Sequence, residues 1–153
     1  MIPASGLELV PLQTDAFAGP LAAELFLVGR LLFGAILAFN GINHFLDTEA
    51  MAGYAGAKGL PAPKLAVLFS GGMLLFGGVG IAFGIVPTLA AGAMALFLLV
   101  ATPLFHDFWA VPEDQKQSEM INFLKNVGLL GGALVFLALS GVTWPYSAGI
   151  AVL

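Results

Sequence analysis

Residues 21–45, LAAELFLVGRLLFGAILAFNGINHF, form an almost wholly apolar stretch in which Glu24 and Arg30 are the charged residues. A helix needs about 20 predominantly apolar residues to cross the hydrocarbon core of a bilayer, so this stretch is long enough to span it. Three similar stretches follow, and we predict transmembrane helices at about 21–46, 64–86, 88–105 and 120–140. The predicted fold class is therefore an all-α membrane protein, a four-transmembrane-helix bundle.

The composition supports the same fold class. Of the 153 residues, 59% are hydrophobic and 9% are charged, whereas about a quarter of a soluble domain is charged. The balance of 5 Lys+Arg against 9 Asp+Glu argues against a nucleic-acid partner, which would need a basic surface. Because the chain has no cysteine, it has no disulfide, thiolate nucleophile or cysteine-held iron–sulfur cluster, and any redox chemistry must belong to a bound cofactor or a partner.

The transmembrane domain is predicted to cover residues 21–141, with a surface segment on each side. Residues 1–20 are interrupted by prolines and are predicted to lie along the membrane surface. Residues 142–153 carry Trp144 and Tyr146, aromatic types that favour the headgroup level, and are predicted to form an interfacial tail. A short interfacial helix is expected around Thr48 to Ala57.

The lysines indicate an orientation. Four spans place both termini on one side of the membrane and the loops after the first and third spans on the other. All four lysines lie on that loop side: Lys58, Lys64, Lys116 and Lys125. The positive-inside rule therefore predicts a multi-pass protein of the cell membrane whose loops are cytoplasmic and whose termini are extracellular.

Small residues recur four apart within the spans, a spacing that lets helix backbones approach closely in lipid. The pairs are Gly34 and Ala38, Gly80 and Gly84, Ala91 and Ala95, and Gly128 and Gly132. They are compatible with tight packing inside one bundle or with contacts between chains. Besides the lipid bilayer, we expect the partner to be a second copy, in a homo-oligomer, or a larger membrane complex.

The polar residues that could carry chemistry gather at the loop side. His44 ends the first span and His106 ends the third, so the topology brings both imidazoles to one surface at similar depth. Neighbouring candidates for ligand binding are Asn40, Asp107, Trp109 and Lys125. These residues could simply finish helices at the interface, bind the headgroup of a quinone or another amphiphile, hold a metal, or ligate a haem. The sequence contains no compact metal-ligand motif, so no metal is predicted.

Arg30 is a further candidate, because a charged residue deep in a span is costly unless it finds a partner. It could extend to the outer headgroups, pair with Glu24, or contact an anion or cofactor. At 1.5 Å per residue it lies about 21 Å along the helix from His44, so the two cannot form one site directly.

Several motifs together resemble the DoxX family of small four-helix membrane proteins. They are GRLLFGAILAFNGINHF at 29–45, the Y-x-x-x-x-G-L-P-x-P pattern from Tyr54 to Pro63, a glycine-rich second span, HDFW at 106–109 and FLKNVGLLGGAL at 123–134. The resemblance covers about residues 25–140. Many members have an acidic residue where this chain has Ser70-Gly71-Gly72, and a lysine at the position of His44, so chemistry that depends on those residues is not carried over.

The resemblance implies a prokaryotic cell-membrane protein. Members of the family have been linked to quinone-reducing thiosulfate oxidation and to oxidoreductase complexes that defend against oxidants. The predicted function is therefore an integral membrane subunit associated with a quinone-linked oxidoreductase or respiratory complex, and a quinone bound near His44 and His106 is the candidate cofactor. The alternative is a non-catalytic structural or lipid-interacting protein that assembles into oligomers.

Overall fold

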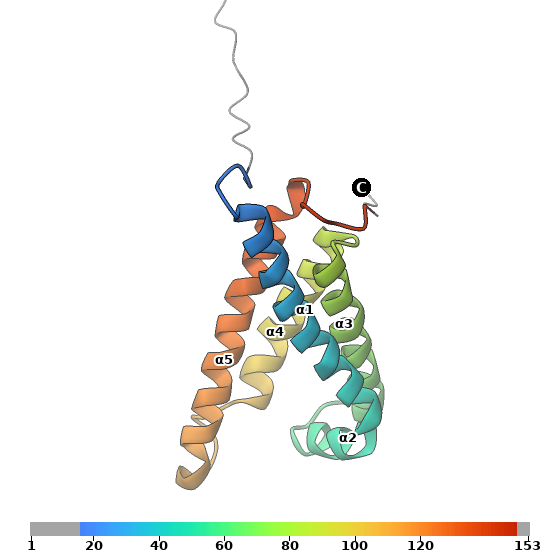
Figure 1. Ribbon diagram of the computed structural model, residues 1–153. Coiled ribbons are helices and arrows are strands. Elements are labelled where there is room, and N and C mark those ends of the chain that lie inside the picture. Colours follow the sequence, from blue (N-terminus) through green and yellow to red (C-terminus); the bar gives the residue numbers. More distant parts are fainter. Residues whose placement is uncertain (1–15, 150–153) are drawn as a thin grey trace, which may run out of the picture.

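The computed structural model describes residues 16–149, and the predicted N-terminal surface segment 1–20 lies mostly outside that range. The helices are α1 (Ala22–Leu46), α2 (Thr48–Ala57), α3 (Pro63–Phe83), α4 (Pro87–Phe105) and α5 (Glu113–Ala138), followed by a 3-10 turn, η1 (Leu139–Gly141) (Figure 1). Four helical segments, α1, α3, α4 and α5 with η1, are long and apolar enough to cross a membrane. The predicted all-α fold with four transmembrane helices is confirmed.

The turns between the spans follow from prolines and one glycine. Pro63 and Pro87 occupy the first turns of α3 and α4, where the missing N–H has no helical partner to lose. α3 ends because Gly84 adopts a left-handed conformation with φ of 65°, and Ile85 then donates a backbone hydrogen bond of 2.8 Å to the Gly80 carbonyl. The short α3–α4 turn makes these two helices an antiparallel hairpin.

α5 begins at Glu113, which is earlier than the sequence-based start at 120. The polar residues before Met120 therefore form about two helical turns rather than a loop. Glu113 and Asp114 lie in the first turn, where acidic side chains are favoured by the positive end of the helix dipole.

The closest helix pair is α1 with α3, and glycines make the approach possible. A Cβ atom on Gly78 would lie 2.6 Å from the backbone nitrogen of Ala38 and 2.6 Å from the carbonyl oxygen of Gly34. One on Gly41 would lie 2.5 Å from the backbone nitrogen of Leu75. Backbones can approach this closely only where side chains are absent, as in small-residue interfaces of membrane helices.

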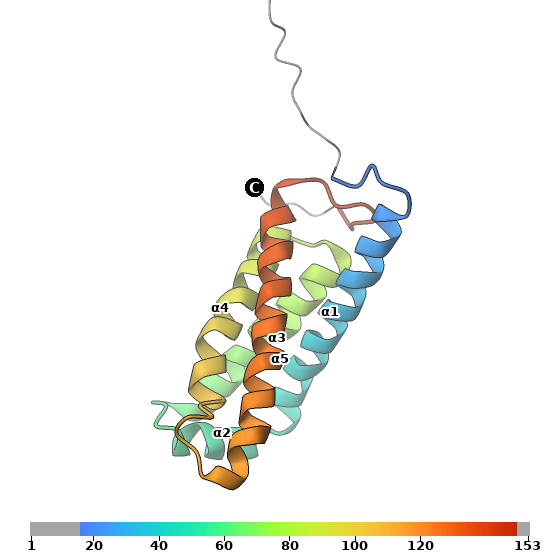
Figure 2. The ribbon, with the colours of Figure 1, turned by 90° about the vertical axis from the view of Figure 1, so that its left-hand side faces the viewer.

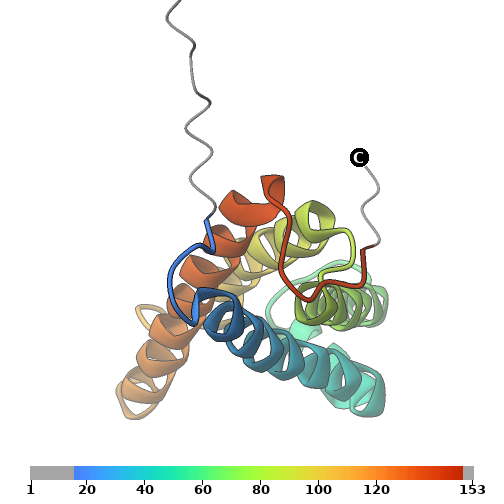
Figure 3. The same ribbon diagram turned by 45° about the horizontal axis from the view of Figure 1, so that its top comes forward.

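The four spans form a bundle that is tighter at one end. α3 packs between α1 and α4, and α5 packs on α4. α1 and α5 meet near the termini, where the Phe33 and Phe136 rings are 5.2 Å apart, and then diverge toward the loop end (Figures 1 and 3). α2 packs against α3 at that loop end, opposite the end where residues 16 and 149 lie (Figure 2).

Residues 142–149 run across the terminal end of the bundle from α5 toward α3 (Figure 3). Trp144 is buried there and donates its indole N–H to the Leu139 carbonyl at 2.9 Å. The backbone N–H of Ala148 donates to the carbonyl of Phe83 at the end of α3, at 2.8 Å. This segment, which we name the C-terminal strap, therefore ties the end of α5 to the end of α3.

Most of the glycines that could mediate contacts between chains pack against other residues of the same chain. Built Cβ atoms on Gly80, Gly84 and Gly132 would meet Ala90, Ser147 and Phe33, at 2.6, 2.6 and 2.9 Å. A Cβ on Gly128 would meet nothing within 4 Å, so among these four it alone faces outward. Association with a second copy or a larger complex stays a prediction.

Candidate functional site

His44 and His106 line one cavity of about 550 Å³ at the loop end of the bundle. His44 lies in the last turn of α1, and His106 caps the C-terminal end of α4, where Pro103 has already removed one donor from the helix ladder. A smaller cavity of about 230 Å³ is lined by the same two histidines together with Asn40. The topology thus brings the two imidazoles together in space, although no direct contact joins them.

The larger cavity, which we name the histidine cavity, has an apolar wall and one side that opens toward lipid. Tyr54 and other α2 residues line it at the loop end of the bundle, while α3 and α4 supply most of the remaining wall. Phe69 of α3 and Leu96 and Val100 of α4 also line it, and their exposed fractions of 68%, 57% and 55% show that they belong to the outer surface. An apolar chain could therefore enter between α3 and α4 from the bilayer.

Each imidazole has one nitrogen engaged by the protein. His44 Nδ1 lies 2.8 Å from the carbonyl oxygen of Asn40, one turn earlier in α1. His106 Nδ1 lies 2.8 Å from Glu119 Oε2, on the second turn of α5. Nε2 is the nitrogen left for a ligand in both rings. The Phe97 ring packs edge-on against His44, with 6.4 Å between centroids, and restrains its orientation.

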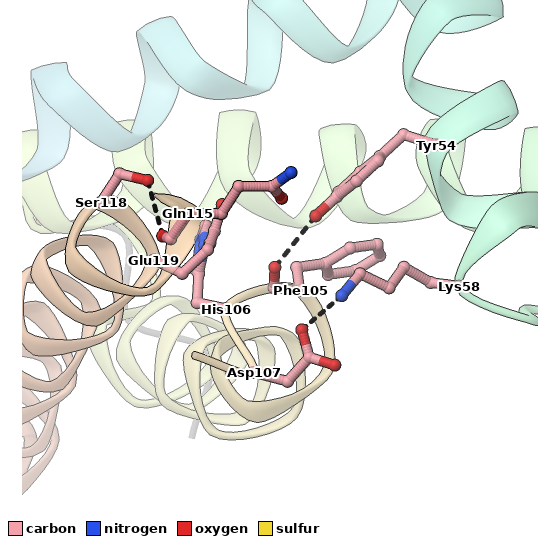
Figure 4. A network of polar contacts seen from close by, with 8 residues as sticks. All are labelled: Tyr54, Lys58, Phe105, His106, Asp107, Gln115, Ser118 and Glu119. Atoms are coloured by element: carbon pink, nitrogen blue, oxygen red, sulfur yellow. Dashed lines mark hydrogen bonds and ion pairs between the residues drawn. The ribbon is translucent and has the colours of Figure 1, made fainter. Parts of the chain in front are cut away.

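α2 is fastened to the end of α4 by two side chains, and we name these contacts the α2 latch (Figure 4). The Tyr54 hydroxyl donates to the Phe105 carbonyl at 3.1 Å, and Lys58 forms an ion pair with Asp107. The hydrogen bond between them raises the pKa of Lys58 and lowers the pKa of Asp107 from their ordinary values. The latch holds Tyr54 beside the cavity that it lines.

The structure places the other predicted site residues outside the histidine cavity. Asp107 faces Lys58 rather than a ligand space. Trp109 is 58% exposed and stacks edge-on with Phe108 and Phe123. Lys125 is exposed on α5. Asp107, Trp109 and Lys125 are therefore neighbours of the site and do not form its wall.

Arg30 lies at the other end of the bundle and is fully buried. Its Nη2 donates to the carbonyl oxygen of Tyr146 in the C-terminal strap, and its guanidinium carbon lies 5.8 Å from the ring centres of Phe26 and Trp144. Nε and Nη1 have no hydrogen-bond partner within residues 16–149. Glu24 instead accepts from the Tyr146 hydroxyl at 3.3 Å, so Arg30 neither pairs with Glu24 nor extends to the surface.

Sequence reasoning did not select Glu119, Asn126, Tyr54 or Ser70. Glu119 was placed in the loop before the last span, and only its position on α5 turns it toward His106. Asn126 lines the cavity seven residues later, which is the same face of a helix. Extending the helical period back to Glu113 would have aligned the two. Tyr54 and Ser70 carry no comparable signal, because they reach the cavity only through tertiary packing.

The described residues contain no cluster of three or more histidine, aspartate or glutamate side chains suited to a metal ion.

Fold and site together define a small multi-pass membrane protein with a lipid-accessible cavity at one end.

The DoxX family model matches residues 25–107, and the chain belongs to the DoxX family. It is similar to inner membrane protein YphA of Escherichia coli (strain K12), with 26% identity over 117 residues, which cover 76% of this chain and 83% of the relative. No solved structure matches the chain. The resemblance read from the sequence motifs is thus confirmed at the level of the family.

Proposed function

We propose that this protein is a membrane subunit of a quinone-linked oxidoreductase and that the histidine cavity binds the quinone headgroup. One observation carries the proposal: two imidazoles from distant parts of the chain line a single apolar cavity that is open between α3 and α4. Its volume of about 550 Å³ lies within the range of about 300 to 1,000 Å³ that is usual for sites of small ligands.

The residues of the cavity fit an amphiphile with a polar ring and an apolar tail. The tail would lie along Phe69, Leu96 and Val100 toward the lipid, and the ring would lie at the deeper polar end near His44 and His106. A bound quinone would supply the redox chemistry, and a partner's cofactor would supply the electrons; the chain itself has no cysteine for a thiol relay. The task of this chain is to bind and orient the ring and to exchange protons at the imidazole nitrogens.

Quinone retention tests the proposal. The protein is purified in mild detergent from a quinone-producing host, and extracted quinone per protein is measured by mass spectrometry. His106→Ala and His44→Ala should each weaken retention by about 1 to 3 kcal/mol, the usual loss when a buried hydrogen-bond partner disappears. Lys125→Ala is the matched control, since Lys125 is exposed on α5 and does not line the cavity.

Unchanged quinone content in both histidine variants, with helical circular dichroism intact, contradicts the proposal. It leaves the non-catalytic, lipid-interacting protein as the better account. Association is tested on the same preparations: native mass spectrometry should show a partner or a second copy, and a monomer in every mild detergent contradicts that part.

A further inference from the structure

The histidine cavity has an uneven supply of hydrogen-bond donors and acceptors. Its wall contains five polar side chains, which are His44, Tyr54, Ser70, His106 and Asn126. Four of these already direct a hydrogen at an acceptor of the protein. Ser70 Oγ donates to the Val67 carbonyl at 3.0 Å and the Tyr54 hydroxyl to the Phe105 carbonyl at 3.1 Å, and the two imidazoles make the Nδ1 contacts described above.

The partner of His44 fixes its tautomer. The Asn40 carbonyl oxygen can only accept, so Nδ1 of His44 must carry the hydrogen in that 2.8 Å contact. In the neutral ring Nε2 then has a lone pair and no hydrogen. A ligand at His44 therefore meets an acceptor.

The partner of His106 has a similar effect, because the Glu119 carboxylate accepts from Nδ1. Nε2 of His106 accepts while the ring is neutral.

The two hydroxyl groups add to the same imbalance. Once their hydrogens are committed to backbone carbonyls, Tyr54 and Ser70 offer only oxygen lone pairs to the cavity. The amide of Asn126 offers both a donor and an acceptor, so it favours neither kind of ligand. The cavity as a whole therefore favours a ligand that donates hydrogen bonds.

We propose that the histidine cavity selects a headgroup with hydrogen-bond-donating hydroxyls and so binds a quinol more tightly than the corresponding quinone. This inference rests on the proposed function and names the redox form that the site prefers. A quinone presents only carbonyl lone pairs, which would oppose the lone pair on Nε2 of His44. Accommodating it by moving the hydrogen to Nε2 would break the contact with the Asn40 carbonyl.

Three probes that share the carbon skeleton of the ring and the decyl tail test this preference: decylubiquinol, decylubiquinone and the dimethyl ether of decylubiquinol, which is larger by two methyl groups. The ether keeps the aromatic ring and the tail of the quinol and lacks the two O–H groups. Affinities of the purified protein are measured anaerobically in detergent by isothermal titration calorimetry. The quinol should bind about tenfold or more tighter than both the quinone and the ether, because the other two leave cavity acceptors unpaired.

His44→Leu should remove most of this preference by lowering quinol affinity toward that of the quinone. Ser70→Ala deletes one acceptor oxygen from the cavity wall and should reduce the preference for the quinol less than His44→Leu does. If His44→Leu fails to fold, the Ser70→Ala protein provides the test. The inference is overturned if the quinone or the ether binds the protein as tightly as the quinol or more tightly. It is also overturned if a folded variant keeps the whole preference of the unchanged protein for the quinol. Tight quinone binding would leave the proposed function standing, whereas binding of none of the three probes overturns both.

Discussion

At the scale of single residues, the glycines of α3 differ sharply in what surrounds them. Gly78 faces the backbone of α1, whereas a Cβ on Gly72 of the same helix would meet nothing within 4 Å. Gly78→Ala should destabilise the protein by about 1 to 3 kcal/mol, because the added methyl forces α1 and α3 apart. Gly72→Ala is the control and should be neutral or stabilising by about 0.5 to 1 kcal/mol. Thermal unfolding in detergent measures both, and equal effects would contradict the packing described.

Arg30 holds the C-terminal strap through the carbonyl of Tyr146. Arg30→Met keeps an apolar chain of similar length but removes the donor to the Tyr146 carbonyl. We expect loss of about 1 to 3 kcal/mol in strap stability, seen as faster amide exchange in residues 142–149. Tyr146→Phe is the matched control, because it deletes the hydroxyl contact with Glu24 and keeps the carbonyl that Arg30 binds. Strap exchange that is unchanged in Arg30→Met would show that the strap is held by its apolar contacts alone.

At the scale of elements, the α2 latch has a pH dependence whose sign follows from its ion pair. The lowered pKa of Asp107 adds stability above about pH 3.9, and this is lost as the pH falls through the lowered value. The raised pKa of Lys58 adds stability that is complete below about pH 10.4 and is lost as the pH rises through the raised value. Protection factors of α2 amides should therefore stay level between these limits and fall outside them.

Substitution separates this ion pair from a more exposed one, which joins Glu49 of α2 to Lys64 of α3. Lys58→Met should speed α2 amide exchange at neutral pH by about twofold to fivefold. Lys64→Met is the control: the Lys64 and Glu49 side chains are 61% and 80% exposed, against 19% and 22% for Lys58 and Asp107, so it should change exchange less. A larger effect of Lys64→Met would mean that α2 is held from its other end.

The elements also show what the sequence determines locally. α2 occupies Thr48–Ala57, where the short helix was expected: Asp47 alone separates it from α1, and Gly59 and Pro61 follow its end. The start of α5 was not predictable from hydropathy, since residues 113–119 are polar and resemble a loop although they continue the helix. Hydropathy averaged along the sequence identifies the part of a helix that crosses the lipid and misses the turns that extend into water.

At the scale of the whole molecule, the sequence predicted the end at which polar groups meet but not the cavity between them. The span count alone places His44 and His106 at the loop end. Which neighbours line the site depends on how α1 and α5 diverge and on where α2 packs, and neither is a property of one segment. Asp107 and Trp109 are adjacent to His106 in sequence, yet one pairs with Lys58 and the other stacks on aromatic rings.

The orientation of the whole molecule in the membrane is predicted from where its positive charges lie. Lys58, Lys64 and Lys116 lie at the loop end and Lys125 lies about halfway along α5, whereas Arg30 near the other end is buried. We therefore expect the loops to face the cytoplasm and both termini to face outward. The natural chain has no cysteine, so single cysteines report accessibility without background. Thr143→Cys and Gln117→Cys place one at an exposed position on each side.

An impermeant maleimide applied to spheroplasts should label the cysteine at position 143 and reach the one at 117 only after the membrane is opened. The reverse pattern would invert the topology and place the histidine cavity near the outer surface. Labelling of both positions in intact spheroplasts would mean that the chain inserts in two orientations. A variant with all four lysines replaced by glutamine tests whether charge sets the orientation. If charge sets it, this variant should insert in both orientations; if helix packing sets it, the orientation should stay unchanged.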